Sequence, residues 1–108
     1  MKELLSNLVT KANNNPELLN GLKGTFLFEI TDHENTFWTI KFKGDSVELV
    51  EGRVEEANCT FKLSEKNLSK LIDGSLNPTT AFMMGKIKVN GDLTLALKLQ
   101  SILQKYRA

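Results

Sequence analysis

The order of apolar and polar residues changes several times along the chain, and each change marks an expected helix or strand. Apolar residues recur at i, i+1, i+4, i+5 and i+8 from Leu4 to Ala12, which predicts an amphipathic helix that ends before Pro16. Later stretches alternate between apolar and polar residues, as strands with one buried face do. These predicted strands are residues 24–30, 36–43, the segment around Val47 and Leu49, residues 59–63 and residues 86–90.

Capping and helix-breaking residues mark where the other helices are expected to begin and end. The start and end signals are Pro16 and Gly21, Ser64 and Gly74, Asn77-Pro78 and Gly85, and Asp92 with a last turn near Tyr106. The order of elements predicts one α+β domain over residues 1–108. We expect a five-stranded, mostly antiparallel sheet with helices packed on one face.

The final helix carries more apolar surface than one packing face requires. At about 100° per residue its polar strip is narrow. This strip consists of Thr94, Lys98, Ser101 and Lys105. The opposite side holds Leu95, Ala96, Leu99, Ile102, Leu103 and Tyr106. Leu93 and Leu97 extend the apolar arc beyond about 100°, and Gln100 falls inside it.

Two interpretations of this helix stay open from its pattern. It is either wedged between the sheet and another helix, or it has one face on the core and another lining a lipid cavity. Leu93, Leu95, Leu97 and Leu99 also alternate as in a strand. A helix is favoured because Leu and Ala are strong helix formers and the helical spacing continues to Tyr106.

Aromatic and methionine residues are concentrated on the expected inner surfaces. They are Phe26, Phe28, Trp38, Phe42 and Phe61 on the sheet, and Phe82, Met83 and Met84 on a helix. Residues of this kind at this spacing are typical of a packed core. Methionine also adapts its shape and suits variable apolar ligands, so a ligand-binding interior is the second interpretation.

Composition excludes several classes of function. The 108 residues carry a net charge of only +1, which argues against a nucleic-acid-binding protein. No apolar run approaches the ~20 residues of a membrane-spanning helix, and the first 16 residues do not resemble a signal peptide. The single cysteine, Cys59, excludes an internal disulfide and fits a reducing compartment.

Catalytic and metal-binding patterns are not found in the sequence. His33, the one histidine, is expected in a solvated turn, and Cys59 is expected on an inward strand face, so no Cys–His pair is predicted. No set of residues has the spacing of a metal site, and no Gly-rich phosphate loop is present. We therefore expect no enzyme activity, no metal and no cofactor.

Charge is distributed unevenly along the chain. From residue 86 onward Asp92 is the one acid among the basic residues, whereas residues 29–56 are predominantly acidic. The basic residues after 85 are Lys86, Lys88, Lys98, Lys105 and Arg107. The uneven charge has two interpretations. It belongs either to two solvated faces or to a basic end that makes transient contact with an anionic membrane, where each cation near the surface contributes about 1 kcal/mol of binding free energy.

Several segments together resemble the sterol carrier protein type-two family. They are Ala57–Leu63, Asn77–Gly91, Leu97–Gln100, Trp38-Thr39-Ile40 and Leu103–Tyr106. The last of these looks like the end of the carrier domain of the peroxisomal multifunctional β-oxidation enzyme. The combined order and spacing of the segments carry the resemblance, which extends over nearly the whole chain.

The resemblance implies an α+β fold that encloses a hydrophobic tunnel, in a carrier and not an enzyme. Its implied ligands are fatty acids, fatty acyl-CoA, sterols and phospholipids. The implied tunnel residues are Phe26, Trp38, Ile40, Leu68, Phe82, Met83, Leu95, Leu99 and Ile102, with Gln100 as the polar contact. The final helix is expected to be the moving lid, and the protein to be a monomer without a nucleic-acid partner.

Two other functions remain open at this stage. One is an accessory or interaction module that presents acyl-CoA to a peroxisomal or β-oxidation enzyme partner. The other is a module whose apolar helix docks on a partner or on a second copy. The expected location is cytoplasmic or peroxisomal, although the chain ends in Tyr106-Arg107-Ala108 and not in a Ser-Lys-Leu type of tripeptide.

Overall fold

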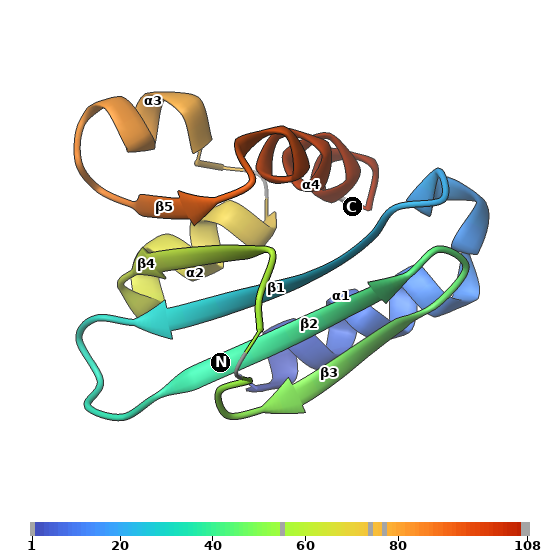
Figure 1. Cartoon of the computed structure of the whole chain (residues 1–108), viewed down its shortest axis with the longest axis horizontal. Helices are drawn as coiled ribbons and strands as arrows, with labels where there is room; N and C mark the ends of the chain where they lie inside the picture. Colours follow the sequence, from blue (N-terminus) through green and yellow to red (C-terminus); the bar gives the residue numbers. More distant parts are fainter. Residues whose placement is uncertain (1, 55, 74, 77, 107–108) are drawn as a thin grey trace.

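A computed structural model describes residues 2–54, 56–73, 75–76 and 78–106 of the chain, without the side chains of residues 78 and 79. Its elements are shown in Figure 1. They are α1 (Lys2–Asn14), the 3-10 helix η1 (Pro16–Leu19), β1 (Lys23–Ile30), β2 (Phe37–Lys43), β3 (Val47–Glu51), β4 (Cys59–Leu63), α2 (Glu65–Asp73), α3 (Pro78–Met83), β5 (Lys88–Gly91) and α4 (Leu93–Lys105).

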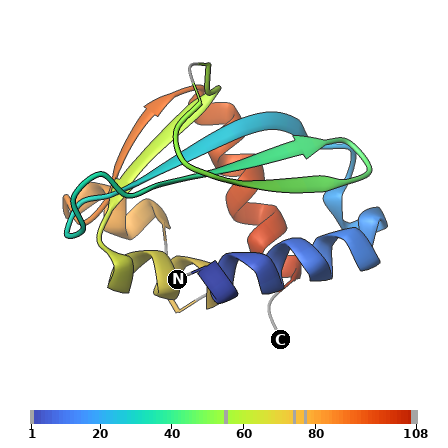
Figure 2. The same cartoon turned by 90° about the horizontal axis from the view of Figure 1, so that it is seen from below.

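The five strands form one sheet in the order β3-β2-β1-β4-β5. Strand β1 is antiparallel to β2 and parallel to β4, and the remaining pairs are antiparallel. Figure 2 shows the helices together on one face of this sheet. The predicted α+β fold with a mostly antiparallel sheet is therefore confirmed.

The parallel pairing of β1 and β4 requires the connection after β3 to return across the outer face of the sheet (Figure 1). The Thr39 hydroxyl donates a hydrogen bond of 2.9 Å to the Gly52 carbonyl, and Arg53 lies 5.4 Å from the centroid of the Phe37 ring. At the end of the connection, the Thr25 amide donates to the Asn58 side chain at 2.8 Å. This covering explains why Thr39 is buried although alternation places it on the outer face.

The core lies between the inner face of the sheet and the helices. Phe28 stacks on Phe61 with ring centroids 5.2 Å apart, and Phe26 meets Phe42 edge-on at 5.3 Å. Leu5, Leu19 and Leu68 reach this layer from α1, η1 and α2, and all three are fully buried. The expected inward set of sheet aromatics is thus core packing.

Helix signals in the sequence correspond to hydrogen bonds in the structure. The Ser64 hydroxyl accepts from the Asn67 amide at 3.1 Å, as an N-cap of α2 should. Gly85 ends α3 in the left-handed region, with φ 75°. The proposed signals at Gly74 and Asn77 lie outside the described residues.

Strand β5 is shorter than the predicted strand 86–90. The Lys86 amide bonds to the Ala81 carbonyl at 2.9 Å, and the Gly85 amide bonds to the Phe82 carbonyl at 3.1 Å. These two bonds form a Schellman motif at the end of α3. Lys86 is consequently held by the helix terminus and is not available to the sheet.

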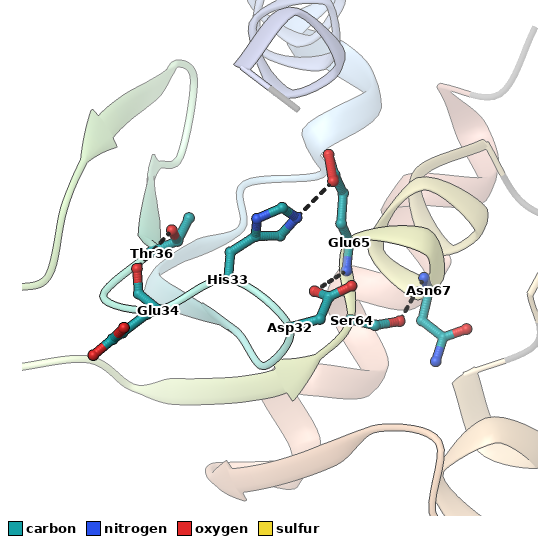
Figure 3. Close-up of polar contacts among 7 residues, drawn as sticks. All are labelled: Asp32, His33, Glu34, Thr36, Ser64, Glu65 and Asn67. Carbon is teal, nitrogen blue, oxygen red and sulfur yellow. Dashed lines mark hydrogen bonds and ion pairs between the residues drawn. The ribbon is translucent and has the colours of Figure 1, made fainter.

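The turn between β1 and β2 attaches to the start of α2 (Figure 3). Asp32 accepts a hydrogen bond of 3.0 Å from the Glu65 amide, and His33 Nε2 lies 2.8 Å from Glu65 Oε1. His33 is exposed in a turn, as predicted, and it also has a carboxylate partner. These contacts fix α2 beneath the sheet.

Gly91→Ala is expected to lower the free energy of unfolding by at least about 2 kcal/mol. Gly91 has φ 106°, and a Cβ atom there would lie 2.2 Å from the Asn58 carbonyl oxygen. Urea unfolding followed by the fluorescence of Trp38 measures the loss.

Gly52→Ala is the matched control for this substitution. Gly52 has φ 113°, but nothing lies within 4 Å of the position that a Cβ atom would take there. The loss in this variant therefore reports the backbone conformation alone, about 1 kcal/mol. Equal losses in the two variants would show that the close approach of Gly91 to Asn58 does not matter.

Candidate functional site

An apolar pocket of about 190 Å³ lies between α3, α4 and the inner side of β4 and β5. It is lined by Phe61, Phe82, Ile87, Val89, Leu93, Ala96, Leu97 and Gln100. Gln100 is the one polar residue among the described residues that line it. The pocket therefore suits an apolar ligand, with one amide available for a polar group.

Part of the pocket lining belongs to a set of exposed apolar side chains on and next to α3 and on α4, which we term the apolar rim. Among the described residues, the large apolar side chains with high exposure are Phe82 (48%), Met83 (81%), Met84 (64%), Leu93 (56%) and Leu97 (61%). Three of them, Phe82, Leu93 and Leu97, also line the pocket. The pocket is thus continuous with the molecular surface through apolar groups.

The start of α4 is fixed to the sheet. The Asp92 carboxylate caps the helix by accepting from the Thr94 amide at 3.0 Å and the Leu95 amide at 3.2 Å, which confirms the predicted cap. The Asp92 amide donates to the Asn58 carbonyl at 2.9 Å, and Cys59 Sγ donates to the Asp92 carbonyl at 2.8 Å. Helix α4 therefore leaves β5 in one defined direction.

The end of α4 is also fixed. The Tyr106 hydroxyl donates a hydrogen bond of 2.6 Å to the Asn15 carbonyl, between α1 and η1. Leu99, Ile102 and Leu103 are buried against the core. With both ends held and this face buried, the side of α4 that carries Leu93 and Leu97 is directed to the pocket and to solvent.

The two faces of the final helix have different surroundings, and a lipid in the pocket stays a prediction. Helix α4 packs on the core with one face, while Leu93 and Leu97 line a pocket instead of packing on another helix. The alternating leucines also fit a strand, but they lie in a helix of thirteen residues, as predicted.

The structure separates the sequence-predicted site residues into four groups. Phe82 and Gln100 line the pocket, and Met83 lies on the apolar rim. Leu95 lies on the other side of α4. The remaining six are buried in the core: Phe26, Trp38, Ile40, Leu68, Leu99 and Ile102. Their contact with a ligand stays a prediction.

Six pocket residues are absent from the predicted set. They are Phe61, Ile87, Val89, Leu93, Ala96 and Leu97. The surplus apolar arc pointed to Leu93 and Leu97, and the alternation of residues 86–90 placed Ile87 and Val89 on one face. Only the packing of α4 against the end of the sheet brings these two signals together.

A second, more polar pocket of about 440 Å³ lies on the other side of α4, against η1 and the start of β1. Lys98, Ser101 and Lys105 of the predicted polar strip line it, together with Lys23 and Leu95. Helix α4 thus separates an apolar pocket from a cationic one.

Burial alters the titration of two groups that hold α4. Desolvation raises the pKa of the Cys59 thiol, next to the start of the helix. Desolvation also raises the pKa of the Tyr106 hydroxyl, and the charge of Glu17 adds to this effect. Both groups therefore stay protonated, as donors, well above neutral pH.

Within the described residues, no group of three or more His, Cys, Asp or Glu side chains is placed to hold a metal ion. None of the described helices combines the length and hydrophobicity that a membrane span requires. The lining of the apolar pocket points to the class of ligand, because it is almost entirely apolar.

Comparison with known proteins identifies the family. A model of the SCP-2 sterol transfer family matches residues 1–104. The chain belongs to this family. The resemblance seen in the sequence is thereby confirmed. Sterol carrier protein 2 of Bos taurus is 33% identical over 82 residues, which are 73% of this chain and 15% of that protein.

Hydroxysteroid dehydrogenase-like protein 2 of Xenopus laevis is 32% identical over 95 residues, 87% of this chain and 23% of that protein. The chain therefore spans a quarter or less of the length of these relatives of the SCP-2 family.

Solved structures of the family share the fold. The sterol carrier protein domain 2 of Helicoverpa armigera superposes with a TM-score of 0.77 at 29% identity, covering 97% of this chain and 85% of that one. Palmitated SCP2L2 of Aedes aegypti superposes with a TM-score of 0.72 at 19% identity, covering 93% and 90%. The latter likeness concerns the fold alone.

The free energy of unfolding is expected to fall as the pH rises above 9.0, which is the ordinary pKa of a cysteine thiol. Because the folded pKa values of Cys59 and Tyr106 are raised, the unfolded chain releases these protons first. Their contribution is complete below the unfolded pKa values and is lost as the pH rises through the folded ones.

Urea unfolding at a series of pH values tests this dependence. Cys59→Ala should make the decline above pH 9.0 shallower, because the buried thiol no longer titrates. A decline that keeps the same slope in this variant would contradict the assignment to Cys59.

Proposed function

We propose that the chain binds a single lipid with its apolar part in the pocket between α3, α4 and β5, and transfers it between membranes. The observation that carries this proposal is an apolar pocket that opens through the exposed side chains of Phe82, Leu93 and Leu97. Fatty acids, fatty acyl-CoA, sterols and phospholipids are the ligand classes proposed from family membership.

Hydrophobic burial supplies the affinity in this proposal. Each methylene removed from water contributes about 0.8 kcal/mol, so a long acyl chain has enough apolar surface for micromolar binding after ordering costs. The pocket of about 190 Å³ is smaller than the roughly 300 Å³ at which ligand sites usually begin. Binding of a whole acyl chain therefore requires the pocket to widen.

Helix α3 is the element proposed to move, in place of the final helix expected from the sequence. Helix α4 is bonded at both ends through Asp92 and Tyr106, which opposes its movement. In α3, Ala81 is buried, whereas Phe82 and Met83 are exposed. Displacement of α3 therefore breaks less apolar packing than displacement of α4.

Widening toward the core would form the tunnel predicted from the family resemblance. Phe61 lines the pocket and also stacks on Phe28 of the core, so it links the two regions. Deeper in the core, the Trp38 indole nitrogen is buried and has no acceptor among the described residues. A lipid oxygen that reached this donor would satisfy it.

An accessory role is the second candidate function. The matched relatives are much longer than this chain, and one is named a hydroxysteroid dehydrogenase-like protein. A domain of this kind could present acyl-CoA to a peroxisomal or β-oxidation enzyme partner. Lipid binding is common to both candidates, and neither requires catalysis by this chain. A monomer in the cytoplasm or peroxisome remains our expectation.

Ala96→Phe is expected to weaken binding of a fluorescent fatty acid at least tenfold, about 1.4 kcal/mol. Ala96 lines the pocket, so the larger ring would occupy space that the ligand needs. Titration of delipidated protein measures the affinity, and mass spectrometry of the untreated sample identifies any lipid that copurifies.

Thr94→Phe is the control for this variant, because it adds the same ring on the exposed polar strip of α4. If both variants bind as the original protein does, the pocket is not the lipid site. If the original protein takes up no fatty acid or sterol, the proposed function is wrong.

Gln100→Leu is expected to change the selectivity between fatty acid and sterol by about fivefold, since one hydrogen bond contributes about 1 kcal/mol. Gln104→Leu, with an exposed side chain one turn later, is expected to leave selectivity unchanged. Competition titrations with both ligands measure the ratio. An unaltered ratio in Gln100→Leu, with folding stability retained, would remove the amide as a head-group contact.

A further inference from the structure

The cationic pocket on the far side of α4 lies next to η1 and the start of β1 (Figure 1). We term it the lysine pocket, because Lys98 and Lys105 of α4 and Lys23 of β1 all line it. Its volume of about 440 Å³ is within the roughly 300–1,000 Å³ that is usual for small-molecule sites. The lysine pocket is therefore large enough for an organic ligand as it stands, unlike the apolar pocket.

Positive charge in the lysine pocket is not offset by the described side chains around it. No Asp or Glu is among the described residues that line the pocket. Ion pairs among the described residues involve Lys2, His33 and Lys43, and none of them includes a lysine of the pocket. Glu17 and Asp45 belong to neighbouring segments, but neither lines the pocket. An anionic ligand would supply the missing negative charge.

Ordinary structural roles account for one of the three lysines. Lys105 is in the last turn of α4, where a cation stabilises the helix dipole. Lys98 lies in the middle of this helix, away from its end. Lys23 stands directly opposite Lys43 in the sheet, so like charges meet there. These effects therefore do not explain why all three lysines line one pocket.

The floor of the lysine pocket is apolar and held in place. Leu19, Leu22 and Ile102 line the pocket and are buried. The Gly44 amide donates a hydrogen bond of 2.9 Å to the Leu22 carbonyl, and the Tyr106 hydroxyl holds the end of α4 to the backbone just before η1. A preformed apolar floor beside lysines suits an organic anion, whose ring or alkyl part covers the floor while its charge meets the ammonium groups.

The spacing of the lysines indicates more than one anionic group on the ligand. Lys98 and Lys105 are seven residues apart, which is about 10 Å along a helix. Ser101 and Asn20 also line the pocket, and their side chains can donate hydrogen bonds to oxygen. Phosphate oxygens form strong, charge-assisted hydrogen bonds with donors of this kind.

We propose that the lysine pocket binds an organic molecule that carries two or more phosphate groups. The phosphates contact Lys23, Lys98 and Lys105, and the organic part lies on the apolar floor. The inference goes beyond the proposed function, because it does not require a lipid in the apolar pocket.

Two sources have this chemistry. One is a soluble molecule such as a nucleoside diphosphate. The other is the phosphate-bearing head of a lipid whose chain occupies the apolar pocket. Gln100 and Ser101 are neighbours in the chain and line one pocket each, so such a head would have to cross only the width of α4.

Calorimetric titration of delipidated protein with ADP tests the phosphate site. ADP is expected to bind with a dissociation constant below about 1 mM at low salt, whereas adenosine, which lacks the phosphates, is expected not to bind. Pyrophosphate should bind more weakly than ADP, because it leaves the apolar floor uncovered. An ionic strength of about 0.5 M should weaken ADP binding at least fivefold, since exposed charges are then screened.

Lys98→Gln with Lys105→Gln is expected to weaken ADP binding about fivefold for each lysine. Lys66→Gln with Lys70→Gln is the control, because it removes the same charge from α2, outside the pocket. This variant should bind ADP within about twofold of the original protein. Equal losses in the two variants would assign the binding to the general charge of the protein and overturn the inference.

Ser101→Glu separates charge from space in the pocket. It places a carboxylate among the lysines and is expected to lower ADP affinity at least tenfold. Ser101→Gln adds a side chain of nearly the same size without the charge, and should lower the affinity less than about threefold. Ser101 is exposed, so both variants are expected to fold, which circular dichroism checks. Similar losses in both would overturn the assignment of the pocket to an anion.

Palmitate and palmitoyl-CoA distinguish the two sources of phosphate. If the phosphates belong to a lipid head, palmitoyl-CoA binds at least about tenfold more tightly than palmitate, and Lys98→Gln with Lys105→Gln removes this advantage. If they belong to a soluble molecule, ADP binds protein saturated with palmitoyl-CoA as it binds delipidated protein, and the same variant leaves palmitoyl-CoA affinity unchanged. Either result supports the lysine pocket.

Failure of this inference is distinguishable from failure of the proposed function. ADP binding that depends on the pocket lysines, in a protein that takes up no fatty acid, would refute the proposed function and leave the lysine pocket standing. Uptake of fatty acid, with neither ADP, pyrophosphate nor palmitoyl-CoA bound more weakly by Lys98→Gln with Lys105→Gln, would overturn the inference alone. Equal affinities for ADP and adenosine would also overturn it.

Discussion

Attachment of α4 at both of its ends is the constraint on which the rest of the site depends. Asp92 bonds to Asn58 and holds the start of the helix at the sheet, and Tyr106 bonds to Asn15 and holds its end. Because this helix is held, the core receives Leu99 and its neighbours, and the leucines on the remaining side meet the pocket. The apolar surplus is therefore built into the folded state.

Local signals in the sequence were sufficient for most of the fold, because each acts within a few residues. Ser64 and Asp92 cap helices through their own side chains, and Gly85 supplies the left-handed residue that ends α3. The segment 59–63 alternates and is a strand with the predicted bounds. Local patterns do not predict the parallel pairing of β1 with β4. They also do not predict the burial of Thr39 beneath the connection between β3 and β4. Both depend on which strands meet in space.

The candidate site was less accessible to sequence reasoning for the same reason. Periodicity identifies an inward residue such as Ile40 but does not tell whether it meets another side chain or a cavity, and Ile40 is fully buried in the core. Gln100 was identifiable because a polar residue inside an apolar arc is anomalous on its own helix. Phe61 carries no such anomaly. Its position at the pocket follows from β4 lying next to the edge strand, which is a property of the sheet order.

The brevity of β5 has a consequence for how the molecule behaves at high concentration. A sheet edge presents unpaired amide and carbonyl groups, and such an edge beside exposed apolar side chains invites strand-to-strand aggregation. Here the edge strand has only four residues, carries an exposed lysine at its start and stops at Gly91, whose φ of 106° departs from strand geometry. The edge at β5 is therefore too short to pair stably with a strand of a neighbouring chain. Exposed apolar side chains at the pocket can be kept without sheet-to-sheet association at this edge.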